Sequence, residues 1–300
     1  MTARHHSPII AFAVGVLGIA LFSAMDAVMK GLVLAIGTYA TMFWRNLAGI
    51  GLSGALYLPR RQGWPDRSTM KIHLARGVLS TFMGFLFFWG IGRVPLAQAI
   101  ALAFIAPLIA LYLASLMLHE KVGARTVGGS MVAFAGVLVI FVGQAQADLG
   151  RDALIGSLAI LVSAGLYALN IIIMRRQALV AKPLEITFFQ SLIVTSTLAL
   201  ALPVVGTSFP PLEQWPWLLL ACALAVTSML LLSWAYARAE ASYLAATEYT
   251  AFLWAALFGW LIFNEPLSTF TLAGAGMIVA GCILAARRPE EASPKLEVAT

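Results

Sequence analysis

The stretch Trp89–Gly90–Ile91–Gly92–Arg93, followed by Glu120, returns 145 positions later as Trp234–Ala235–Tyr236–Ala237–Arg238, followed by Glu265. Alanine and leucine matches carry little weight in so apolar a chain, but matched tryptophan, arginine and glutamate are hard to obtain from composition. The second half of the chain therefore repeats the first. The same shift pairs further residues without a gap: Gly129 with Gly274, Gly136 with Gly281, Phe43 with Phe188 and Leu47 with Leu192.

The composition is that of a membrane protein. The chain has 300 residues, of which 61% are hydrophobic and only 11% are charged, whereas a soluble domain carries roughly a quarter charged residues. The first apolar run continues past Phe22 to Met25, and about nine further runs follow it, which does not fit a cleavable signal with a soluble remainder. We expect an all-α integral membrane protein and no soluble enzyme.

Several function classes are disfavoured by how the polar residues are distributed. The net charge is +6, but Lys and Arg lie in short clusters between apolar runs, so no nucleic-acid partner is expected. Cys222 and Cys282 both lie inside apolar runs, which is typical of small buried hydrophobes and not of a disulfide or metal pair. No metal-ligand spacing, nucleophile–base pair or phosphate loop is present, so we expect no metal, no cofactor and no enzymatic activity.

Ten apolar segments are long enough to span a membrane, which takes about 20 residues each. They divide into two repeats of five spans, residues 9–143 and 153–287, and a polar tail follows at 288–300. Because five is odd, the second repeat enters the membrane from the opposite side, and such inverted repeats are typical of secondary transporters. The spans are expected at 9–30, 39–58, 72–92, 96–118, 125–143, 153–174, 185–205, 214–237, 242–263 and 267–286.

The orientation follows from the positively charged residues. With the N-terminus inside, only Lys30, Arg93 and Arg151 fall in outer loops, and Arg45 and Arg76 fall within spans. The other 14 of the 19 Lys and Arg residues then lie on the inner side. Both termini and the tail are therefore expected to be cytoplasmic.

Charged residues inside spans are costly and so are candidates for function. Asp26 lies four residues before Lys30, which puts both on one face of a helix, and at a depth similar to that of Arg45. Two interpretations stay open: an ion pair of Asp26 with Lys30 or Arg45 that locks or couples the helices, or a role in binding substrate. Arg76 lies about one turn into the third span, where its side chain can extend to the inner interface.

Glu248 lies inside the ninth span without a cation within helical reach in the sequence. A lone buried carboxylate tends to take up a proton. Glu248 is therefore expected to be a neutral hydrogen-bonding group in a cavity or a proton-coupling site, unless it has a structural partner. Its counterpart in the first repeat is Ala103, so such a role belongs to one half only.

Aromatic side chains follow helical spacing in the third span, at Phe82, Phe85 and Trp89, and the ninth span carries Tyr249 and Trp254. Such stripes pack against neighbouring helices or lipid, or they line a cavity that suits a medium-sized amphipathic solute. We expect these five residues to form an apolar wall of a substrate site. Three polar residues are expected to orient the substrate beside Glu248: Gln98, Tyr167 and Asn170.

Proline and glutamate mark the ends and breaks of the spans. Pro107 interrupts the fourth span near its middle and is expected to act as a hinge. Glu120 and Glu265 end the fourth and ninth spans, where a carboxylate can cap the span that follows. The glycine-rich fifth and tenth spans are expected to be packed scaffold helices.

These residues resemble the drug/metabolite transporter superfamily, and specifically its EamA-type ten-helix members. The resemblance rests on Phe43–Trp44–Arg45, on His119–Glu120 and on Asn264–Glu265–Pro266, and it covers roughly residues 9–287. It implies a basket of two inverted five-helix repeats with spans one, three, four, six, eight and nine around the cavity. Among its members, the chain looks most similar to the YddG-type amino-acid exporters. Gln190 departs from its counterpart Arg45, so the two halves differ at that position.

The sequence thus predicts a secondary transporter of the inner membrane that exports amino acids, aromatic or hydrophobic ones among them, and related metabolites by alternating access. Export of drugs or other metabolites through the same cavity is one alternative, and a passive channel is another. The expected partners are a small-molecule substrate and the lipid bilayer. Formation of a homo-oligomer is left open, because the small-residue faces could pack internally or against a second copy.

Overall fold

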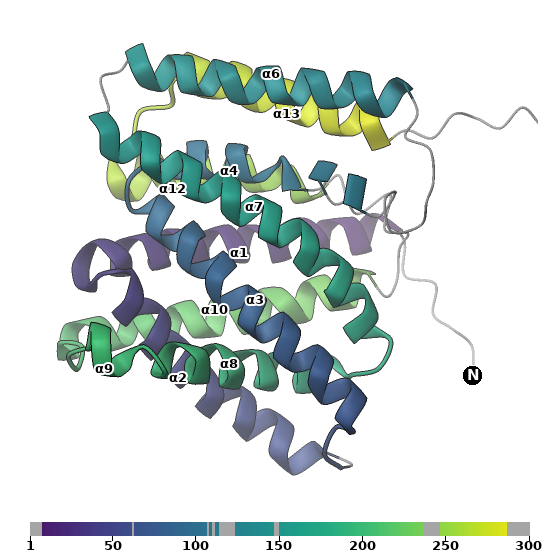
Figure 1. The fold of residues 1–300 in the computed structure, drawn as a ribbon, viewed down its shortest axis with the longest axis vertical. Helices are drawn as coiled ribbons and strands as arrows, with labels where there is room; N and C mark the ends of the chain where they lie inside the picture. Colours follow the sequence, from purple (N-terminus) through teal and green to yellow (C-terminus); the bar gives the residue numbers. More distant parts are fainter. Residues whose placement is uncertain are drawn as a thin grey trace, which may run out of the picture.

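The computed structural model describes residues 8–61, 63–106, 108–109, 112–113, 124–146, 150–236 and 247–286. Within these ranges every regular element is a helix, as the sequence predicts, and no strand is found (Figure 1). The α-helices are α1 (Pro8–Ile36), α2 (Thr38–Tyr57), α3 (Arg67–Ile91), α4 (Leu96–Ala103), α6 (Ala124–Gln146), α7 (Gly150–Ala178), α8 (Pro183–Ala199), α9 (Leu202–Val205), α10 (Trp215–Tyr236), α12 (Thr250–Phe263) and α13 (Thr269–Ala286). Two short 3-10 helices are η1 (Leu58–Arg60) and η2 (Leu212–Gln214).

Two pairs of equivalent helices begin at equivalent positions of the two halves. Helix α2 begins at Thr38 and α8 at Pro183, and α6 begins at Ala124 and α13 at Thr269. Both pairs of starts are separated by the 145 positions of the repeat. The repeat of the sequence is therefore matched by the positions of these helices.

The packing of the helices repeats as well. Helix α1 packs along α10 and α3 packs along α7, while α2 lies against α8 and α6 against α13 (Figure 1). The repeat relates α1 to α7 and α3 to α10, so the first two contacts are the same contact made once by each half. The last two contacts join equivalent helices, which places them on the axis that relates the halves.

Glycine makes the contact between α6 and α13 close. A Cβ atom on Gly136 would lie 2.6 Å from the carbonyl oxygen of Gly274, and one on Gly281 would collide with the carbonyl oxygen of Gly129. The repeat converts the first of these contacts into the second. Small residues here let two backbones approach closely, as in other helix pairs in membranes.

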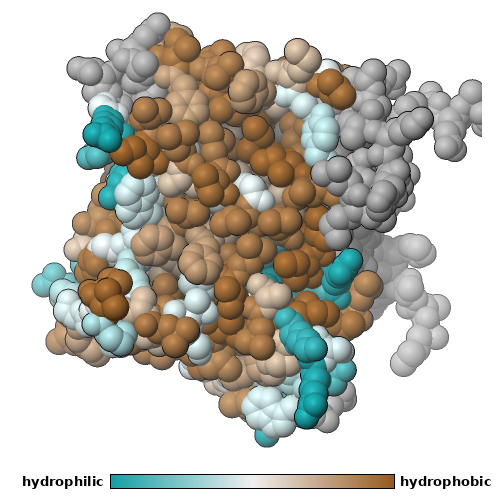
Figure 2. All heavy atoms as spheres, in the orientation of Figure 1, coloured by the Kyte–Doolittle hydropathy of each residue, from teal (hydrophilic) through white to brown (hydrophobic). Residues whose placement is uncertain are grey.

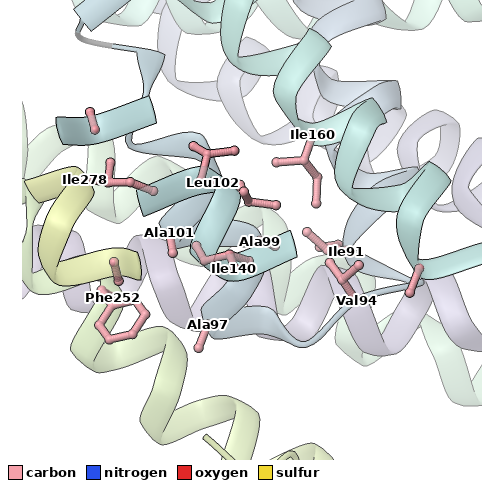
Figure 3. Close-up of a cluster of buried hydrophobic side chains, with 14 of the residues drawn as sticks. Ile91, Val94, Ala97, Ala99, Ala101, Leu102, Ile140, Ile160, Phe252 and Ile278 are labelled. Carbon is pink, nitrogen blue, oxygen red and sulfur yellow. The ribbon is translucent and has the colours of Figure 1, made fainter. Parts of the chain in front are cut away.

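Helix α4 lies in the largest cluster of buried apolar side chains among the described residues (Figure 3). Its residues Ala99, Ala101 and Leu102 are completely buried, and they pack among side chains of α6, α7, α12 and α13 such as Ile140 and Ile278. Because alanine is small, the neighbouring helices come close to the α4 backbone. This short helix is thereby held from several sides.

The helix of the fourth expected span is broken. Helix α4 ends at Ala103, and a turn follows at Phe104 and Ile105. Pro107 itself lies outside the described residues, but a proline clashes with the carbonyl group four residues before it, which accounts for an end at Ala103. The equivalent position of the second half, Tyr249, is also a turn, directly before α12. The rings of Phe104 and Tyr249 meet edge to face with their centroids 5.6 Å apart, so the two breaks touch.

The outer surface is apolar over much of its area. Figure 2 shows hydrophobic residues across the middle of the face in view, with hydrophilic residues gathered toward two opposite edges. Among the described residues, four helices are long and apolar enough to cross a membrane, and three shorter helices are apolar too. The four long segments are Ile9–Ile36, Arg67–Ile91, Gly150–Met174 and Leu212–Leu232.

Candidate functional site

A pocket of about 480 Å³ opens beside Gly37, the residue that joins α1 to α2. Gly37 has a φ of 79°, a conformation that favours glycine, and it lets the chain reverse between the two helices. Phe85 and Trp89, two residues of the expected aromatic wall, line this Gly37 pocket. The remaining lining residues are Val33, Leu34, Gly37, Thr38, Tyr39, Gly92, Arg93 and Asp152.

Charged side chains give the Gly37 pocket a polar rim that the sequence analysis missed. The guanidinium of Arg93 lies 3.5 Å from the centroid of the Trp89 ring and donates a hydrogen bond of 2.9 Å to the carbonyl oxygen of Trp89. Asp152 brings a carboxylate to the same pocket. Both residues lie at helix ends that the sequence assigns to loops. Phe82, in contrast, is 58% exposed and does not line the pocket.

Two charged side chains, the buried Asp26 of α1 and the half-buried Arg45 of α2, do not form an ion pair with each other. Asp26 is only 3% exposed, and its Oδ1 atom has no hydrogen-bond partner. Arg45 donates from Nη1 to Oδ1 of Asn46 at 3.2 Å, while its Nε is buried without a partner. The two charges interact electrostatically, but no ion pair joins them among the described residues.

Lys30 pairs with Glu265 and not with Asp26. Its ammonium group contacts the Glu265 carboxylate, donates a hydrogen bond of 2.7 Å to the carbonyl oxygen of Val94, and lies 5.1 Å from the centroid of the Phe263 ring. The expected pair of Asp26 with Lys30 is therefore wrong. The four-residue spacing puts both on one helix face, but it does not decide which carboxylate the longer lysine side chain reaches.

The end of α12 positions the Glu265 carboxylate. Asn264 adopts a left-handed conformation with a φ of 52°, and the amide of Glu265 donates to the carbonyl oxygen of Gly259 at 3.1 Å. The amide of Asn264 donates to the carbonyl oxygen of Trp260 at 3.1 Å, so α12 ends in an αL motif. Gly259 also leaves room for the carboxylate, because a Cβ atom there would lie 3.0 Å from Oε2 of Glu265.

The same carboxylate caps a helix of the other half. Oε2 of Glu265 accepts a hydrogen bond of 2.8 Å from the amide of Leu96, the first residue of α4. The expectation that Glu265 caps the next span is therefore wrong. We call Lys30, Glu265 and Leu96 the Lys30 cluster. The repeat aligns Lys30 with Arg175 and Glu265 with Glu120; Glu120 and the Arg175 side chain lie outside the described residues.

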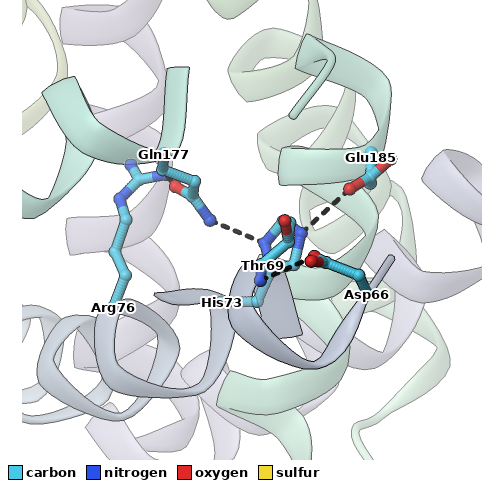
Figure 4. Close-up of polar contacts among 6 residues, drawn as sticks. All are labelled: Asp66, Thr69, His73, Arg76, Gln177 and Glu185. Atoms are coloured by element: carbon cyan, nitrogen blue, oxygen red, sulfur yellow. Dashed lines mark hydrogen bonds and ion pairs between the residues drawn. The ribbon is translucent and has the colours of Figure 1, made fainter. Parts of the chain in front are cut away.

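A second set of polar contacts joins α3 to α7 and α8 (Figure 4). Arg76 donates from Nη1 to Oε1 of Gln177 at 2.5 Å, and Nε2 of Gln177 lies 2.7 Å from Nδ1 of His73. Nε2 of His73 lies 3.1 Å from the Glu185 carboxylate. We call these four residues the Arg76 chain. Arg76 is 6% exposed, so the expectation that it extends to an interface is wrong.

The chemistry of the Arg76 chain assigns the proton on His73. Arginine can only donate, so Gln177 turns its oxygen to Arg76 and its amide nitrogen to His73. Nδ1 of His73 is then an acceptor, and the proton sits on Nε2, which donates to Glu185. The sequence analysis missed His73, although its place one turn before Arg76 on the same helix was a usable signal.

The three polar residues that were expected to orient the substrate do not lie together in the structure. Asn170 accepts hydrogen bonds from Nε of Arg76 at 3.2 Å and from Oγ of Ser80 at 3.3 Å, so it extends the Arg76 chain. Tyr167 interacts electrostatically with Glu248, Arg76 and Asp26. Gln98 donates to Oγ of Ser157 at 3.3 Å and lines a smaller pocket of about 160 Å³ beside Glu265.

The expected residues of the ninth span do not line the Gly37 pocket. Glu248 is exposed at the turn before α12, and Tyr249 packs on Phe104. Trp254 stacks on Phe258 at 6.4 Å, with its Nε1 buried and without a partner. Among the described residues, no three metal-binding side chains come together.

Helices with apolar outer faces that enclose charged side chains and a polar pocket define an integral membrane protein that handles solutes. Residues 9–142 and 154–287 each match the model of the EamA-like transporter family. The chain belongs to this family and is a multi-pass membrane transporter, not an enzyme.

Named relatives carry different solutes. The chain is 26% identical to a pseudopaline exporter of Pseudomonas aeruginosa over 89% of this chain and 92% of the relative. It is 28% identical to a riboflavin transporter of Rhizobium johnstonii over 89% of this chain and 87% of the relative. A crystal structure with 20% identity superposes with a TM-score of 0.60, covering 93% of this chain and 98% of that chain, and it shares the fold.

Proposed function

We propose that this transporter exports amino acids and related metabolites across the inner membrane by alternating access. The observation that carries the proposal is the Gly37 pocket, in which the aromatic rings of Phe85 and Trp89 meet the charges of Arg93 and Asp152. Apolar walls with a few charged groups suit a small solute that has an apolar part and charged ends.

The proposed topology is ten spans with both termini in the cytoplasm. It rests on the 14 of 19 Lys and Arg residues that fall on one side when the spans are alternated. The Gly37 pocket then opens to the outer side. Contacts that repeat between the halves, such as α1 with α10 and α3 with α7, support rocking of the two repeats as the transport motion.

Export of a larger metabolite is the second candidate. A pocket of about 480 Å³ falls within the roughly 300–1,000 Å³ typical of sites for drug-sized ligands, which exceeds the need of a single small amino acid. The family relationship does not choose between the two, because the relatives above are named for pseudopaline and for riboflavin.

Counterflow in proteoliposomes tests the proposal. Vesicles are loaded with one unlabelled amino acid, and the same labelled amino acid is added outside at low concentration. A carrier accumulates label transiently above equilibrium, and the internal amino acids that drive accumulation rank the substrates. Simple equilibration of label points to a channel. Absence of uptake for every amino acid overturns the amino-acid proposal in favour of the larger metabolite.

Two phenylalanines of α3 make a matched pair for this assay. Phe85 lines the Gly37 pocket, whereas Phe82, one turn away, is exposed and does not. We expect Phe85→Ala to weaken the apparent affinity by about tenfold, the size of a lost aromatic anchor. Phe82→Ala should change it far less. Equal losses in both variants would remove the Gly37 pocket from the transport path.

A further inference from the structure

Asp26 and Arg45 lie below the Gly37 pocket on the helix faces that line it. Asp26 is seven residues before Val33 on α1, and Arg45 is seven residues after Thr38 on α2, and both Val33 and Thr38 line the pocket. Seven residues are about two turns, or roughly 10 Å, and return to the same helix face. Because α1 and α2 meet at Gly37, Asp26 and Arg45 both lie on the same side of that junction, about two to three turns into their helices.

Each of these side chains keeps an unused hydrogen-bonding atom in the interior. Oδ1 of Asp26 and Nε of Arg45 are buried without partners. A buried polar atom without a partner costs free energy, and a buried charge without a partner costs more. Opposite charges that interact electrostatically could relieve the cost by pairing, yet no ion pair joins Asp26 and Arg45. Both groups therefore have capacity for a ligand.

The two buried cations of the described helices, Lys30 and Arg76, are already engaged. Lys30 binds Glu265 and the carbonyl oxygen of Val94. Arg76 binds Gln177 and Asn170. Cys222 of α10 also interacts electrostatically with Arg45, but a thiol is a weak hydrogen-bonding group. Asp26 and Arg45 thus differ from Lys30 and Arg76, because each keeps a buried polar atom without a hydrogen-bond partner.

We infer that Asp26 and Arg45 form a zwitterion site, in which the carboxylate of Asp26 receives the ammonium group of an α-amino acid and the guanidinium of Arg45 receives its carboxylate. Charge-assisted hydrogen bonds of this kind are short and strong, and a guanidinium matches the geometry of a carboxylate. The apolar side chain of the ligand is directed toward Phe85 and Trp89 in the pocket above. The inference rests on the proposed function and gives its substrate class: molecules with an ammonium and a carboxylate group on one carbon.

The test uses three probes that share one ring and differ in charge. Phenylalanine carries both groups, phenethylamine lacks the carboxylate, and phenylpropanoate lacks the ammonium group. Binding of each probe to the purified full-length protein in detergent is measured by calorimetry. We expect phenylalanine to bind at least about tenfold more tightly than either analogue, because a site built for a charged group rejects ligands that lack it.

Two neutral variants test the two charged groups of the site separately. Asp26→Asn should abolish the preference for phenylalanine over phenylpropanoate and keep the preference over phenethylamine. Arg45→Gln, which installs the residue of the second repeat at Gln190, should do the reverse. Asp26→Glu and Arg45→Lys keep the charges and should keep both preferences. Ser53→Ala is the matched control, because Ser53 of α2 only binds the carbonyl oxygen of Gly49 in its own helix.

The outcomes distinguish failure of the zwitterion site from failure of the proposed transport function. Wild-type protein that binds an analogue as tightly as phenylalanine overturns the zwitterion site, even if no variant can be purified. Neutral variants that keep both preferences overturn it too, and Asp26 and Arg45 are then a structural pair only. Counterflow of amino acids with either result leaves the proposed function standing. Preferential binding of phenylalanine without any counterflow supports the site and overturns the transport proposal.

Discussion

The Lys30 cluster and the Arg76 chain both join the first half of the protein to the second, but they do so in different ways. In the Lys30 cluster a cation of α1 meets a carboxylate from the end of α12 directly, and that carboxylate also caps α4. In the Arg76 chain the guanidinium of α3 reaches Glu185 of α8 only through the side chains of Gln177 and His73.

The difference lies in what fixes each arrangement. A direct ion pair is held by charge, so either partner is costly to lose when the other stays buried. The Arg76 chain is held by donor and acceptor direction, since Arg76 orients the Gln177 amide and the amide selects the His73 tautomer. We expect the stability of the Lys30 cluster to depend on charge and the stability of the Arg76 chain to depend on hydrogen-bonding capacity.

Removing the carboxylate charge from the Lys30 cluster should have the largest effect. Glu265→Gln keeps an oxygen for the amide of Leu96 but leaves the Lys30 ammonium buried without a counter-charge. We expect the free energy of unfolding to fall by about 3–5 kcal/mol, measured by denaturant titration in detergent micelles. The double variant Lys30→Met/Glu265→Gln should recover most of this loss. A double variant no more stable than Glu265→Gln would show that charge is not what holds the cluster.

An apolar residue in the Arg76 chain should lower the free energy of unfolding by less than Glu265→Gln does. Gln177→Leu leaves Nη1 of Arg76 and Nδ1 of His73 without the partners that they have now. We expect a loss of about 1–3 kcal/mol in the free energy of unfolding, by the same titration. Ser80→Ala is the control, because Asn170 keeps its hydrogen bond from Arg76. If Gln177→Leu matched Glu265→Gln in cost, the contrast between the two regions would fail.

The cap of α3, the helix that carries the Arg76 chain, should give the smallest effect and a distinct pH response. Oδ1 of Asp66 accepts from the amide of Thr69 at 2.9 Å, and Oδ2 accepts from the Ser68 hydroxyl at 2.8 Å. Hydrogen bonds from Thr69 and Ser68 lower the pKa of Asp66 from 3.8 to about 2. A lowered pKa means that the cap stabilises fully above pH 3.8 and that this stabilisation is lost as the pH falls to about 2.

The measurement is the melting temperature of wild type and Asp66→Ala across that pH range. Asp66→Ala should be less stable at neutral pH, and the two curves should converge near pH 2. Asp66→Asn keeps an oxygen that can cap the helix, so it should stay close to wild type at neutral pH and lack the acid step. A constant difference between wild type and Asp66→Ala at all pH values would show that ionisation of Asp66 does not stabilise α3.

Parts of the candidate site were predictable from local patterns. Phe85 and Trp89 were selected by their helical spacing and line the Gly37 pocket. Asp26 and Arg45 were selected as charges inside apolar segments and are buried, or nearly so, between helices. Arg93 and Asp152 were missed because they lie at helix ends, where a charge is ordinarily solvated and carries no signal. Gln177 was missed for a similar reason, since nothing local shows that its amide lies between Arg76 and His73.

The sequence by itself determined the duplication and the apolar character of the helices. These features depend on composition and on spacing along the chain, which neighbouring residues set. Only the tertiary structure decided that Lys30 pairs with a carboxylate 235 positions away, that Glu265 caps α4 and that Asp26 and Arg45 stay unpaired. The partner of a long charged side chain depends on how helices pack in three dimensions, and helical spacing restricts only the face from which it starts.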